Sequence, residues 1–470
     1  MHSPLVVLGG GPGGYAAAFR AADLGVATAI VEARPRLGGT CLLEGCIPSK
    51  ALLHAVGGRA QAEELADWGI AFGAPQIDVA KLRARKDQLV RQLSDGLAGL
   101  AKQRKVQVIR ARGRLADPRT LALSGGEHDG EHLTFESLII ATGSSPAVPG
   151  PLQSKSRRVM TSQEALALAD VPESLLVVGG GYIGLEMGTV YARLGSRVTV
   201  VEMLDRLLSG ADMDLVRPLH KRLRSLFADI RLGCRVEGVK ESGGQMEVTL
   251  AAADETTTEK FDRVLVSVGR RPNCDDLGLG NTAVQRSDDG FIVVDAAQRT
   301  REAHILAVGD VTGQPMLAHK AFHEGCAAAQ VVAGRAGPSR PRAIPAVTFT
   351  DPEIAWAGLS EEQARRRGVD VDVARYPWAA SGRAHAIGRT EGVTKLLFER
   401  SSGRLVGAGI VGSDAGELIA ECTLAIEMGC RAEEIAATVH AHPMLSETIA
   451  AAADVQLGLA TEIYRPKRKT

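Results

Sequence analysis

The apolar positions of this chain fall into short continuous runs that alternate with longer helical segments. Leu5–Leu8 is such a run, and its length and apolar character predict a buried strand. It leads into a glycine-rich turn at Gly9–Gly14, and then into a helical segment that runs to Leu24 and is ended by Gly25. A second predicted strand ends at Glu32. This order of strand, turn, helix, strand and acidic residue is typical of a dinucleotide-binding domain with a parallel sheet.

The same pattern recurs later in the chain with the same internal spacing. Leu175–Val178 predicts a strand, Gly179–Gly184 forms the turn, and the helical segment runs to Leu194, where Gly195 ends it. The following strand ends at Glu202. A single G-x-G-x-x-G sequence is weak evidence, but two copies in the same context, each with an acid at the same offset, indicate two dinucleotide-binding domains.

The glycines of each turn let the backbone approach a pyrophosphate, which is held at the positive N-terminus of the helix. Glu32 and Glu202 are expected to accept hydrogen bonds from a ribose hydroxyl group. In the second copy, the charge of Glu202 would repel the 2′-phosphate of NADP, and no arginine follows until Arg206, so NAD is favoured. The turn glycines are Gly9, Gly11 and Gly14 in the first copy and Gly179, Gly181 and Gly184 in the second.

Three further apolar runs predict buried strands that end in glycine turns. Leu138–Gly143 and Val264–Gly269 each close one nucleotide-binding domain, and Ile305–Asp310 indicates that the first domain resumes after the second. A linker at Pro341–Pro345 precedes alternating strands and alanine-rich helices. The expected fold class is α/β, with two Rossmann-like domains and a C-terminal α+β domain. The predicted parts are the first nucleotide-binding domain (1–149), the second (150–275), the resumed first domain (276–342) and the C-terminal domain (343–470).

Composition limits the functions that are open to the chain. Of 470 residues, 55 are Lys or Arg and 55 are Asp or Glu, so no protein-wide field favours nucleic acid or anionic membranes. No apolar run approaches the roughly 18 residues of a membrane-spanning helix. The first strand begins almost at once, so we expect no signal peptide. The short basic run at 465–469 is expected to be a solvated tail.

The cysteines provide the chemistry. Cys41 and Cys46 are separated by four residues, and the small loop that a disulfide would close adds little stability, so the pair suits redox cycling better than structural cross-linking. The other five cysteines are scattered and are expected to be reduced core thiols, which fits the cytoplasm. No Cys-x-x-Cys sequence occurs and no histidine lies at ligand spacing, so no metal site is expected.

The cysteine pair lies just after the first glycine-rich turn, and this position indicates which nucleotide each domain binds. Nicotinamide passes two electrons only as hydride, whereas a flavin accepts them from a thiolate and hands them on as hydride. FAD in the first domain and NAD in the second is therefore the consistent order.

The stretch GGTCLLEGCIPSKALLH, residues 38–54, resembles the redox-active disulfide of the FAD-dependent disulfide oxidoreductases, and most closely that of the dihydrolipoamide dehydrogenases. Glutathione reductase-like members usually have Pro-Lys-Lys where this chain has Pro48-Ser49-Lys50. The family's usual Asn-Val between the cysteines is Leu43-Glu44 here, a departure that leaves both sulfurs in place.

A second constellation lies near the C-terminus. A histidine followed by proline, with a carboxylate five positions on, is a good candidate for a general base whose ring the carboxylate orients. His442 and Glu447 have this spacing, and the stretch resembles the family's His-Pro-Thr-x-x-Glu motif with Met444 in place of threonine. The resemblance implies that His442 is the catalytic base and Glu447 its partner. His440 is expected to have a structural or supporting role.

The resemblance covers essentially the whole chain. It implies a glutathione-reductase-like fold, a dimerisation role for the C-terminal α+β domain, and further site residues. Lys50 would lie near the flavin and pair with Glu186, and the base would reach the disulfide of the partner subunit in a homodimer. The implied FAD-binding residues are Gly9, Gly11, Gly14, Glu32, Thr40, Lys50, Gly113, Thr142, Gly143, Ser144, Asp310, Met316, Leu317, Ala318 and His319. The implied NAD-binding residues are Gly179, Gly181, Tyr182, Gly184, Glu186, Glu202, Val236 and Gly269.

The implied reaction is oxidation of protein-bound dihydrolipoamide by NAD, with lipoyl domains of an acyltransferase or of a glycine-cleavage carrier as partners. Pro48-Ser49-Lys50 and Glu202 oppose the alternative of a glutathione reductase. The lack of a vicinal cysteine pair near the C-terminus opposes a mercuric reductase, and the presence of both redox cysteines opposes a transhydrogenase. A flavin-bearing scaffold without activity is the alternative from another class.

Overall fold

The computed structural model describes residues 1–470 except 254, 336–340 and 465–470, so the basic run at 465–469 lies outside the described residues. The chain divides into two compact units. The domain boundaries predicted above give a finer division, which stays a prediction. The first unit comprises Met1–Gly150, Met160–Val171 and Val266–Arg340, and the second comprises Pro151–Val159, Pro172–Leu265 and Pro341–Thr470.

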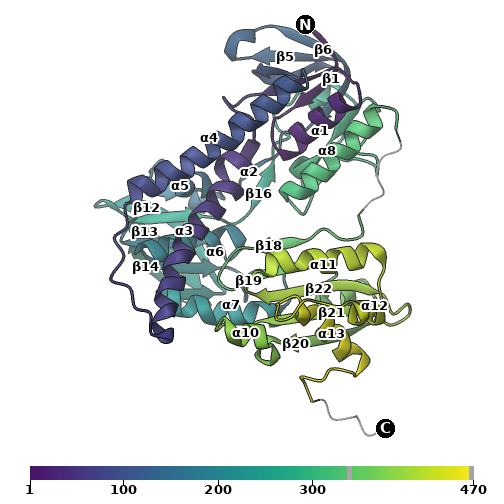
Figure 1. Ribbon diagram of the computed structural model, residues 1–470. Helices are drawn as coiled ribbons and strands as arrows, with labels where there is room; N and C mark the ends of the chain where they lie inside the picture. The colour runs from purple at the N-terminus through teal and green to yellow at the C-terminus, as the bar shows by residue number, and fades with distance from the viewer. Residues whose placement is uncertain (254, 336–340, 465–470) are drawn as a thin grey trace. The chain divides into compact units, whose positions relative to one another are not determined.

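A seven-stranded sheet organises the first unit, in the order β3-β2-β1-β6-β5-β4 with β17 also paired to β6 (Figure 1). Strand β1 pairs in parallel with β2 and β6, and β6 pairs in parallel with β17. Leu8 lies opposite Val31, so the turn after β1 and the end of β2 meet at one edge of the sheet. The strands are β1 (His2–Leu8), β2 (Thr28–Glu32), β3 (Gln107–Arg110), β4 (Arg112–Asp117), β5 (Thr120–Ser124), β6 (His132–Ile140) and β17 (Ile305–Ala307).

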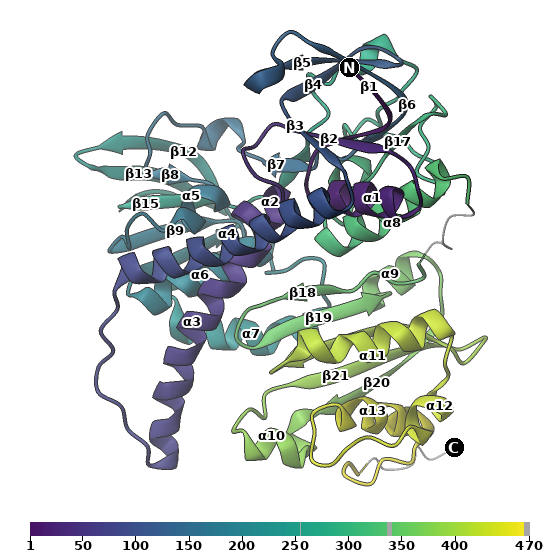
Figure 2. The ribbon, with the colours of Figure 1, turned by 45° about the horizontal axis from the view of Figure 1, so that its top comes forward.

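Helices cover this sheet because its apolar strands are buried on both faces. Leu5, Val7 and Ile30 pack with α1 and α8 in one core cluster, and Val6, Leu8 and Val31 belong to another. Figure 2 shows α1 and α8 side by side below the sheet. A short antiparallel pair joins β7 (Ser144–Pro146) to β16 (Arg270–Pro272). The helices of this unit are α1 (Pro12–Asp23), α2 (Gly39–Glu44), α3 (Cys46–Glu64), α4 (Val79–Gln103), α5 (Ser162–Ala167) and α8 (Ala318–Val332).

The second unit contains a sheet in the order β11-β10-β9-β15-β8, a three-stranded antiparallel sheet β12-β13-β14, and the helices α6 (Tyr182–Leu194) and α7 (Met213–Leu226). Strands β9 and β10 are parallel, like β1 and β2 in the first unit. The strands are β8 (Val159–Met160), β9 (Ser174–Val178), β10 (Arg197–Glu202), β11 (Asp229–Leu232), β12 (Cys234–Ser242), β13 (Gln245–Ala252), β14 (Glu255–Phe261) and β15 (Arg263–Val266).

An antiparallel sheet in the order β18-β19-β22-β21-β20 forms the C-terminal part of the same unit. Helix α11 packs on β19 and β22, and α13 packs on β20 and β21 (Figure 2). The strands are β18 (Ala346–Thr348), β19 (Glu353–Gly358), β20 (Val371–Pro377), β21 (Val393–Glu399) and β22 (Leu405–Gly412). The helices are α9 (Glu361–Arg366), α10 (Gly382–Ala386), α11 (Ala415–Met428), α12 (Ala432–Ala437) and α13 (Glu447–Leu457). The expected fold class is confirmed.

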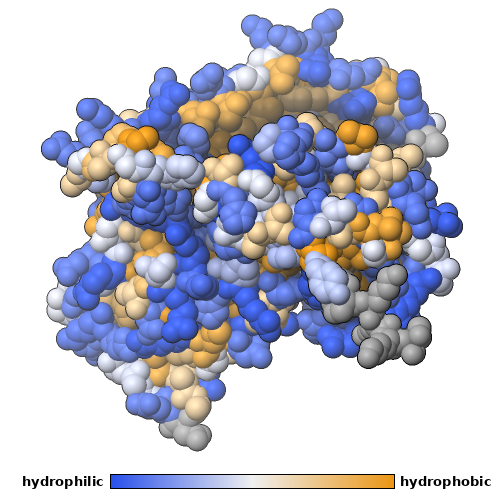
Figure 3. All heavy atoms as spheres, turned by 60° about the horizontal axis from the view of Figure 1, so that its bottom comes forward, coloured by the Kyte–Doolittle hydropathy of each residue, from blue (hydrophilic) through white to orange (hydrophobic). Residues whose placement is uncertain are grey.

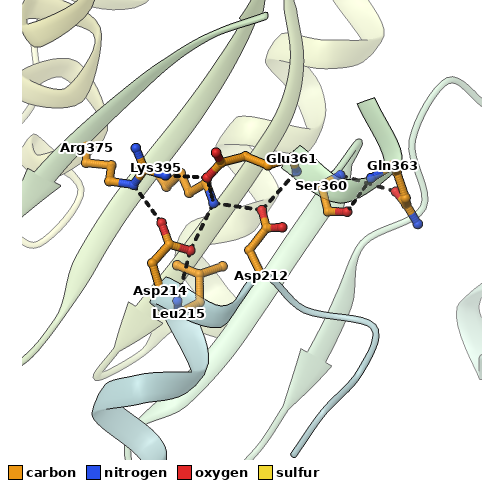
Figure 4. Close-up of polar contacts among 8 residues, drawn as sticks. All are labelled: Asp212, Asp214, Leu215, Ser360, Glu361, Gln363, Arg375 and Lys395. Atoms are coloured by element: carbon orange, nitrogen blue, oxygen red, sulfur yellow. Dashed lines mark hydrogen bonds and ion pairs between the residues drawn. The ribbon is translucent and has the colours of Figure 1, made fainter. Parts of the chain in front are cut away.

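A buried ion cluster joins α7 to the C-terminal sheet within the second unit (Figure 4). Lys395 on β21 is fully buried, and its Nζ lies 2.7 Å from Asp212 Oδ2 and 2.9 Å from Asp214 Oδ1. Glu361 also contacts this ammonium group, and Arg375 Nε donates to Asp214 at 2.6 Å. The three carboxylates are close enough to hold a metal ion, but the Lys395 ammonium already lies among them and supplies the compensating charge.

No helix among the described residues is long and apolar enough to cross a membrane. Apolar and polar residues are interspersed over the face drawn in Figure 3. Several exposed large apolar side chains belong to the C-terminal part, among them Leu424, Met428, Val439 and Leu459.

Candidate functional site

The first glycine-rich turn is held by hydrogen bonds that also fix Glu32. The Glu32 carboxylate accepts hydrogen bonds from the Gly10 N–H at 2.6 Å and the Arg34 N–H at 2.7 Å, and Glu32 lies at the end of β2. Gly9 has a φ of 106°, and a Cβ there would lie 2.4 Å from the Ala141 carbonyl oxygen. Only glycine fits such a position, so the turn follows directly from the sequence.

The second turn repeats this geometry. The Glu202 carboxylate accepts the Gly180 N–H at 2.6 Å and the Leu204 N–H at 2.8 Å. Gly179 has a φ of 108°, close to that of Gly9. The repeat seen in the sequence therefore extends to backbone angles and to the partners of the acidic side chain.

Both turns suit a pyrophosphate. Gly11 precedes α1 and Gly181 precedes α6, and neither residue has a side chain that could cap the first turn of its helix. A Cβ at Gly181 would meet nothing within 4 Å, and one at Gly11 would meet only the Cα of Gly39 at 3.6 Å. Open space at a helix N-terminus, with an acid fixed nearby for a ribose, fits a dinucleotide in each unit.

The two cysteines of the pair lie on consecutive helices of the first unit. Cys41 is in α2 and Cys46 is the first residue of α3, where a thiolate is stabilised by the positive end of the helix. Cys41 and Cys46 are not joined by a disulfide in this structure. A hydrogen bond with Cys46 is the largest influence on Cys41 and, together with burial, it raises the pKa of Cys41 against the opposing charge of Lys50. The position of Cys46 at the start of α3 favours a thiolate at Cys46.

Asp310, a predicted flavin-binding residue, follows β17, which pairs with β6. Asp310 Oδ2 accepts a hydrogen bond from the Ser144 hydroxyl at 2.5 Å. The same hydroxyl oxygen accepts a hydrogen bond from Arg270 Nε at 2.7 Å. Arg270 also donates to the Ser144 carbonyl oxygen at 2.7 Å. Arg270 is not among the predicted site residues, because no motif on the short strand β16 singles it out.

The remaining predicted flavin residues lie on several elements of the first unit. Thr142 donates its hydroxyl hydrogen to the Asn273 carbonyl at 2.8 Å, and Gly143 has a φ of 72°. Gly113 lies on β4, where a Cβ would meet Leu8 Cδ1 at 2.8 Å. The others lie at the ends of α2, α3 and α8, and they are Thr40, Lys50, Met316, Leu317, Ala318 and His319.

The candidate base lies in the second unit. His442 Nδ1 is 2.9 Å from Glu447 Oε1, and the Met444 N–H donates to Glu447 Oε2 at 2.7 Å. The His442 side chain is 80% exposed. Because the carboxylate accepts a hydrogen at Nδ1, the neutral ring carries its lone pair on Nε2, the atom that can take a proton from a substrate. Burial tends to raise the pKa of Glu447, but its hydrogen bonds to Met444 and His442 outweigh burial and lower it.

Glu186 has a partner that the sequence did not reveal. It is buried within α6, and its Oε1 accepts the Phe349 N–H at 3.0 Å. Lys50 belongs to the first unit and Glu186 to the second, so their predicted pairing stays a prediction. The same holds for Gly269 of the first unit as a ligand of NAD beside Tyr182 and Val236 of the second.

Two family models match almost the whole chain. The model described as pyridine nucleotide-disulphide oxidoreductase matches residues 3–325, and the model of the dimerisation domain of these enzymes matches residues 344–453.

Curated relatives and solved structures agree with these matches. The chain is 45% identical to dihydrolipoyl dehydrogenases from Vibrio cholerae and Haemophilus influenzae, over 100% of this chain and 98% of each relative. A solved structure of LpdA from Mycobacterium tuberculosis has a TM-score of 0.88 at 28% identity, covering 96% of this chain and 99% of the other. The HOCl-induced flavoprotein disulfide reductase RclA from Escherichia coli has a TM-score of 0.83 at 26% identity, covering 96% and 98%.

Proposed function

This chain belongs to the pyridine nucleotide-disulphide oxidoreductase family, and from that premise we propose that it oxidises protein-bound dihydrolipoamide with NAD. The observation that carries the proposal is full-length similarity to dihydrolipoyl dehydrogenases, together with a cysteine pair next to the first nucleotide turn. It uses FAD and NAD, for which the two glycine-rich turns and their fixed acids provide sites.

The thiol chemistry uses three side chains of this protein. His442 Nε2 takes the proton of the first substrate thiol, and the resulting thiolate attacks Cys41 Sγ in the disulfide. The Cys41–Cys46 bond breaks, a mixed disulfide forms at Cys41, and Cys46 leaves as a thiolate. His442 passes its proton to solvent and then takes that of the second substrate thiol, which displaces Cys41 so that lipoamide leaves and the cysteine pair holds the two electrons.

FAD, held at the first glycine-rich turn beside Glu32, would supply the two-electron chemistry that links the cysteine pair to hydride transfer to NAD. Glu447 keeps the Nδ1–H of His442 in one orientation and stabilises the imidazolium that forms after each proton transfer. The position of Cys46 at the start of α3 supports its role as the thiolate of the reduced pair.

The match to the dimerisation domain supports a homodimer. We propose that the base of one subunit serves the cysteine pair of the other. We further propose lipoyl domains of a 2-oxoacid dehydrogenase or glycine-cleavage complex as the substrates, and the cytoplasm as the location, since scattered reduced cysteines are usual there.

A substrate comparison tests this proposal. The FAD-loaded protein is supplied with dihydrolipoamide and NAD in one assay, and with glutathione disulfide and NADH or NADPH in another. Rapid NADH formation in the first assay, without oxidation of NADH or NADPH in the second, supports the proposal. Faster turnover of glutathione disulfide would overturn it, and inactivity in every assay would favour a scaffold without activity. Reduced lipoyl domains from the two kinds of complex then identify the partner by their kcat/KM.

A further inference from the structure

A second histidine–carboxylate pair lies two residues before the candidate base. His440 Nε2 is 2.8 Å from Glu421 Oε1, and His440 Nδ1 is 2.9 Å from the Thr438 carbonyl oxygen. The His440 side chain is only 8% exposed, whereas that of His442 is 80% exposed. Glu421 lies on α11, so this pair ties the segment after α12 to a neighbouring helix.

The partners of His440 determine where its protons lie. A carbonyl oxygen can only accept, so Nδ1 must carry a hydrogen. Nε2 lies 2.8 Å from Glu421 Oε1, and an ionised carboxylate accepts a hydrogen from this nitrogen when the ring carries one there. When the ring carries a hydrogen on both nitrogens it is an imidazolium, and Glu421 then compensates its charge. His442 differs, because its partner Glu447 accounts for one ring nitrogen only.

We propose that His440 is a positioning residue for the base, which anchors the 438–444 segment to α11 through its contact with Glu421. The proposal rests on the proposed function, because it assigns His440 a part in the proton transfer that His442 performs. His440 does not itself touch the reacting thiols.

The charge of His440 also acts on the partner of the base. Burial tends to raise the pKa of Glu447, whereas the Met444 N–H, His442 and the charge of His440 lower it, and the lowering prevails. The charged groups that face His440 are Glu421 from α11 and Glu447 from α13. On α12, the Glu434 carboxylate accepts a hydrogen bond from the Arg431 N–H at 2.5 Å. His440 thus helps to keep Glu447 ionised, and an ionised Glu447 orients His442.

Three variants test the proposal: His440→Gln, Glu421→Gln and the double variant. As a matched control, His385→Gln removes a histidine of the same unit whose Nε2 lies 2.8 Å from the Ala379 carbonyl oxygen. For each FAD-loaded dimer, kcat and KM for dihydrolipoamide are measured across pH. NADH oxidation by an artificial electron acceptor is measured in parallel, because it needs FAD and NAD binding but not the base.

We expect His440→Gln to lower kcat roughly tenfold, part of the 10²- to 10⁴-fold effect of a positioned base, with KM nearly unchanged. The acidic limb of the pH profile should move to higher pH, because Glu447 then takes up its proton at higher pH. The double variant should be no worse than either single variant, because the two residues act as one unit. Artificial-acceptor activity and the control variant should match wild type.

Three results would overturn the proposal. The first is a pH profile of His440→Gln that matches wild type. The second is a double variant whose loss of kcat equals the product of the two single-variant losses. The third is a loss of artificial-acceptor activity in proportion to the loss of dihydrolipoamide oxidation, which would indicate general unfolding. Hydrogen–deuterium exchange of residues 438–446 tests the same anchoring without any substrate. Exchange there should quicken in His440→Gln, and unchanged exchange overturns the proposal. Wild type that does not oxidise dihydrolipoamide would count against the proposed function alone.

Discussion

Nδ1 of His442 lies 2.9 Å from Oε1 of Glu447, and the other oxygen of the same carboxylate accepts the Met444 N–H at 2.7 Å. The carboxylate therefore fixes both the ring and the backbone beside it. Met444 stands where the family motif has threonine, and its contact with Glu447 is made through the backbone, so it does not depend on the missing hydroxyl.

Glu447→Gln removes the charge that stabilises the His442 imidazolium. We expect kcat with dihydrolipoamide to fall by about 10²-fold, because a general base without its orienting carboxylate loses much of its contribution. Steady-state kinetics of the FAD-loaded enzyme measure this. Glu433→Gln, an exposed acid on α12, is the control. A kcat within twofold of wild type would show that the carboxylate does not assist the base.

The reduced enzyme should show a long-wavelength charge-transfer band from the Cys46 thiolate next to the flavin. Cys46 is the first residue of α3, where the positive end of the helix favours a thiolate. Cys46→Ser should remove the band in an anaerobic spectrum after gentle reduction. Cys422→Ser, which changes a buried thiol of the second unit, should keep it. If the band persisted in Cys46→Ser, the assignment of the thiolate to Cys46 would be wrong.

The enzyme should prefer NAD to NADP by roughly 100-fold or more in kcat/KM, since placing like charges side by side costs several kcal/mol. Hydrogen bonds to Gly180 and Leu204 hold the Glu202 carboxylate at the end of β10. Arg206, the next arginine, pairs with Glu362 at 2.9 Å and is already engaged. Glu202→Ser should lower the ratio of kcat/KM for NAD to kcat/KM for NADP. Similar kcat/KM values for the two coenzymes in wild type would contradict the assignment.

Lys395→Met should destabilise the protein by about 3–5 kcal/mol, because it leaves three carboxylates with Arg375 as their remaining cation (Figure 4). Lys260→Met, which removes a 58% exposed lysine 3.4 Å from Glu247, should cost less than about 1 kcal/mol. Denaturant unfolding of the two variants compares these costs. Equal losses of unfolding free energy in the two variants would mean that the buried cluster stabilises the protein no more than a surface ion pair does.

The same cluster should make stability depend on pH. Burial works to raise the pKa of Asp214, but hydrogen bonds from Arg375 and Lys395 outweigh it and lower the pKa. A carboxyl group with a lowered pKa stabilises the folded state above its unfolded pKa of about 4, and this stabilisation is lost as the pH falls through the folded value. Lys395→Met should therefore weaken the acid dependence of unfolding between about pH 4 and the folded pKa of Asp214. An unchanged dependence would contradict the role of Lys395.

How far the sequence predicts the molecule differs between its parts. The two nucleotide turns are local, and glycine spacing together with an acid at a fixed offset is enough to specify Gly9, Glu32, Gly179 and Glu202. The structure repeats their hydrogen bonds in both units. The predicted run Leu175–Val178 nearly matches β9, Ser174–Val178. Other strands extend beyond their apolar runs: β1 begins at His2 and β6 at His132, because pairing with neighbouring strands continues past the buried residues.

Other contacts depend on chain segments far apart in sequence. Lys395 interrupts the apolar run of β21 and would be taken for a solvent-facing residue, yet it is buried because Asp212 and Asp214 from α7 surround it. The Phe349 N–H that binds Glu186 offers no side chain to recognise. His440 was noted only as structural or supporting, because its partner Glu421 lies on another helix.

Refolding mixtures test whether each active site is shared between subunits. Cys46→Ser and His442→Ala, each nearly inactive alone, are unfolded together and refolded with FAD. Random pairing makes half of the dimers mixed, and each of these would contain one intact site, so activity should return to about a quarter of wild type. If the base served its own chain, every site would carry a lesion and mixing would restore nothing.

The most direct test of the account is the rate of NADH formation from dihydrolipoamide and NAD by FAD-loaded wild type and Cys41→Ser. We expect rapid, stoichiometric NADH formation by wild type and a loss of at least about 10³-fold in Cys41→Ser, because the sulfur that the substrate attacks is absent. Cys41→Ser should still bind FAD and pass electrons from NADH to an artificial acceptor. A Cys41→Ser enzyme that oxidises dihydrolipoamide at the wild-type rate would contradict the account.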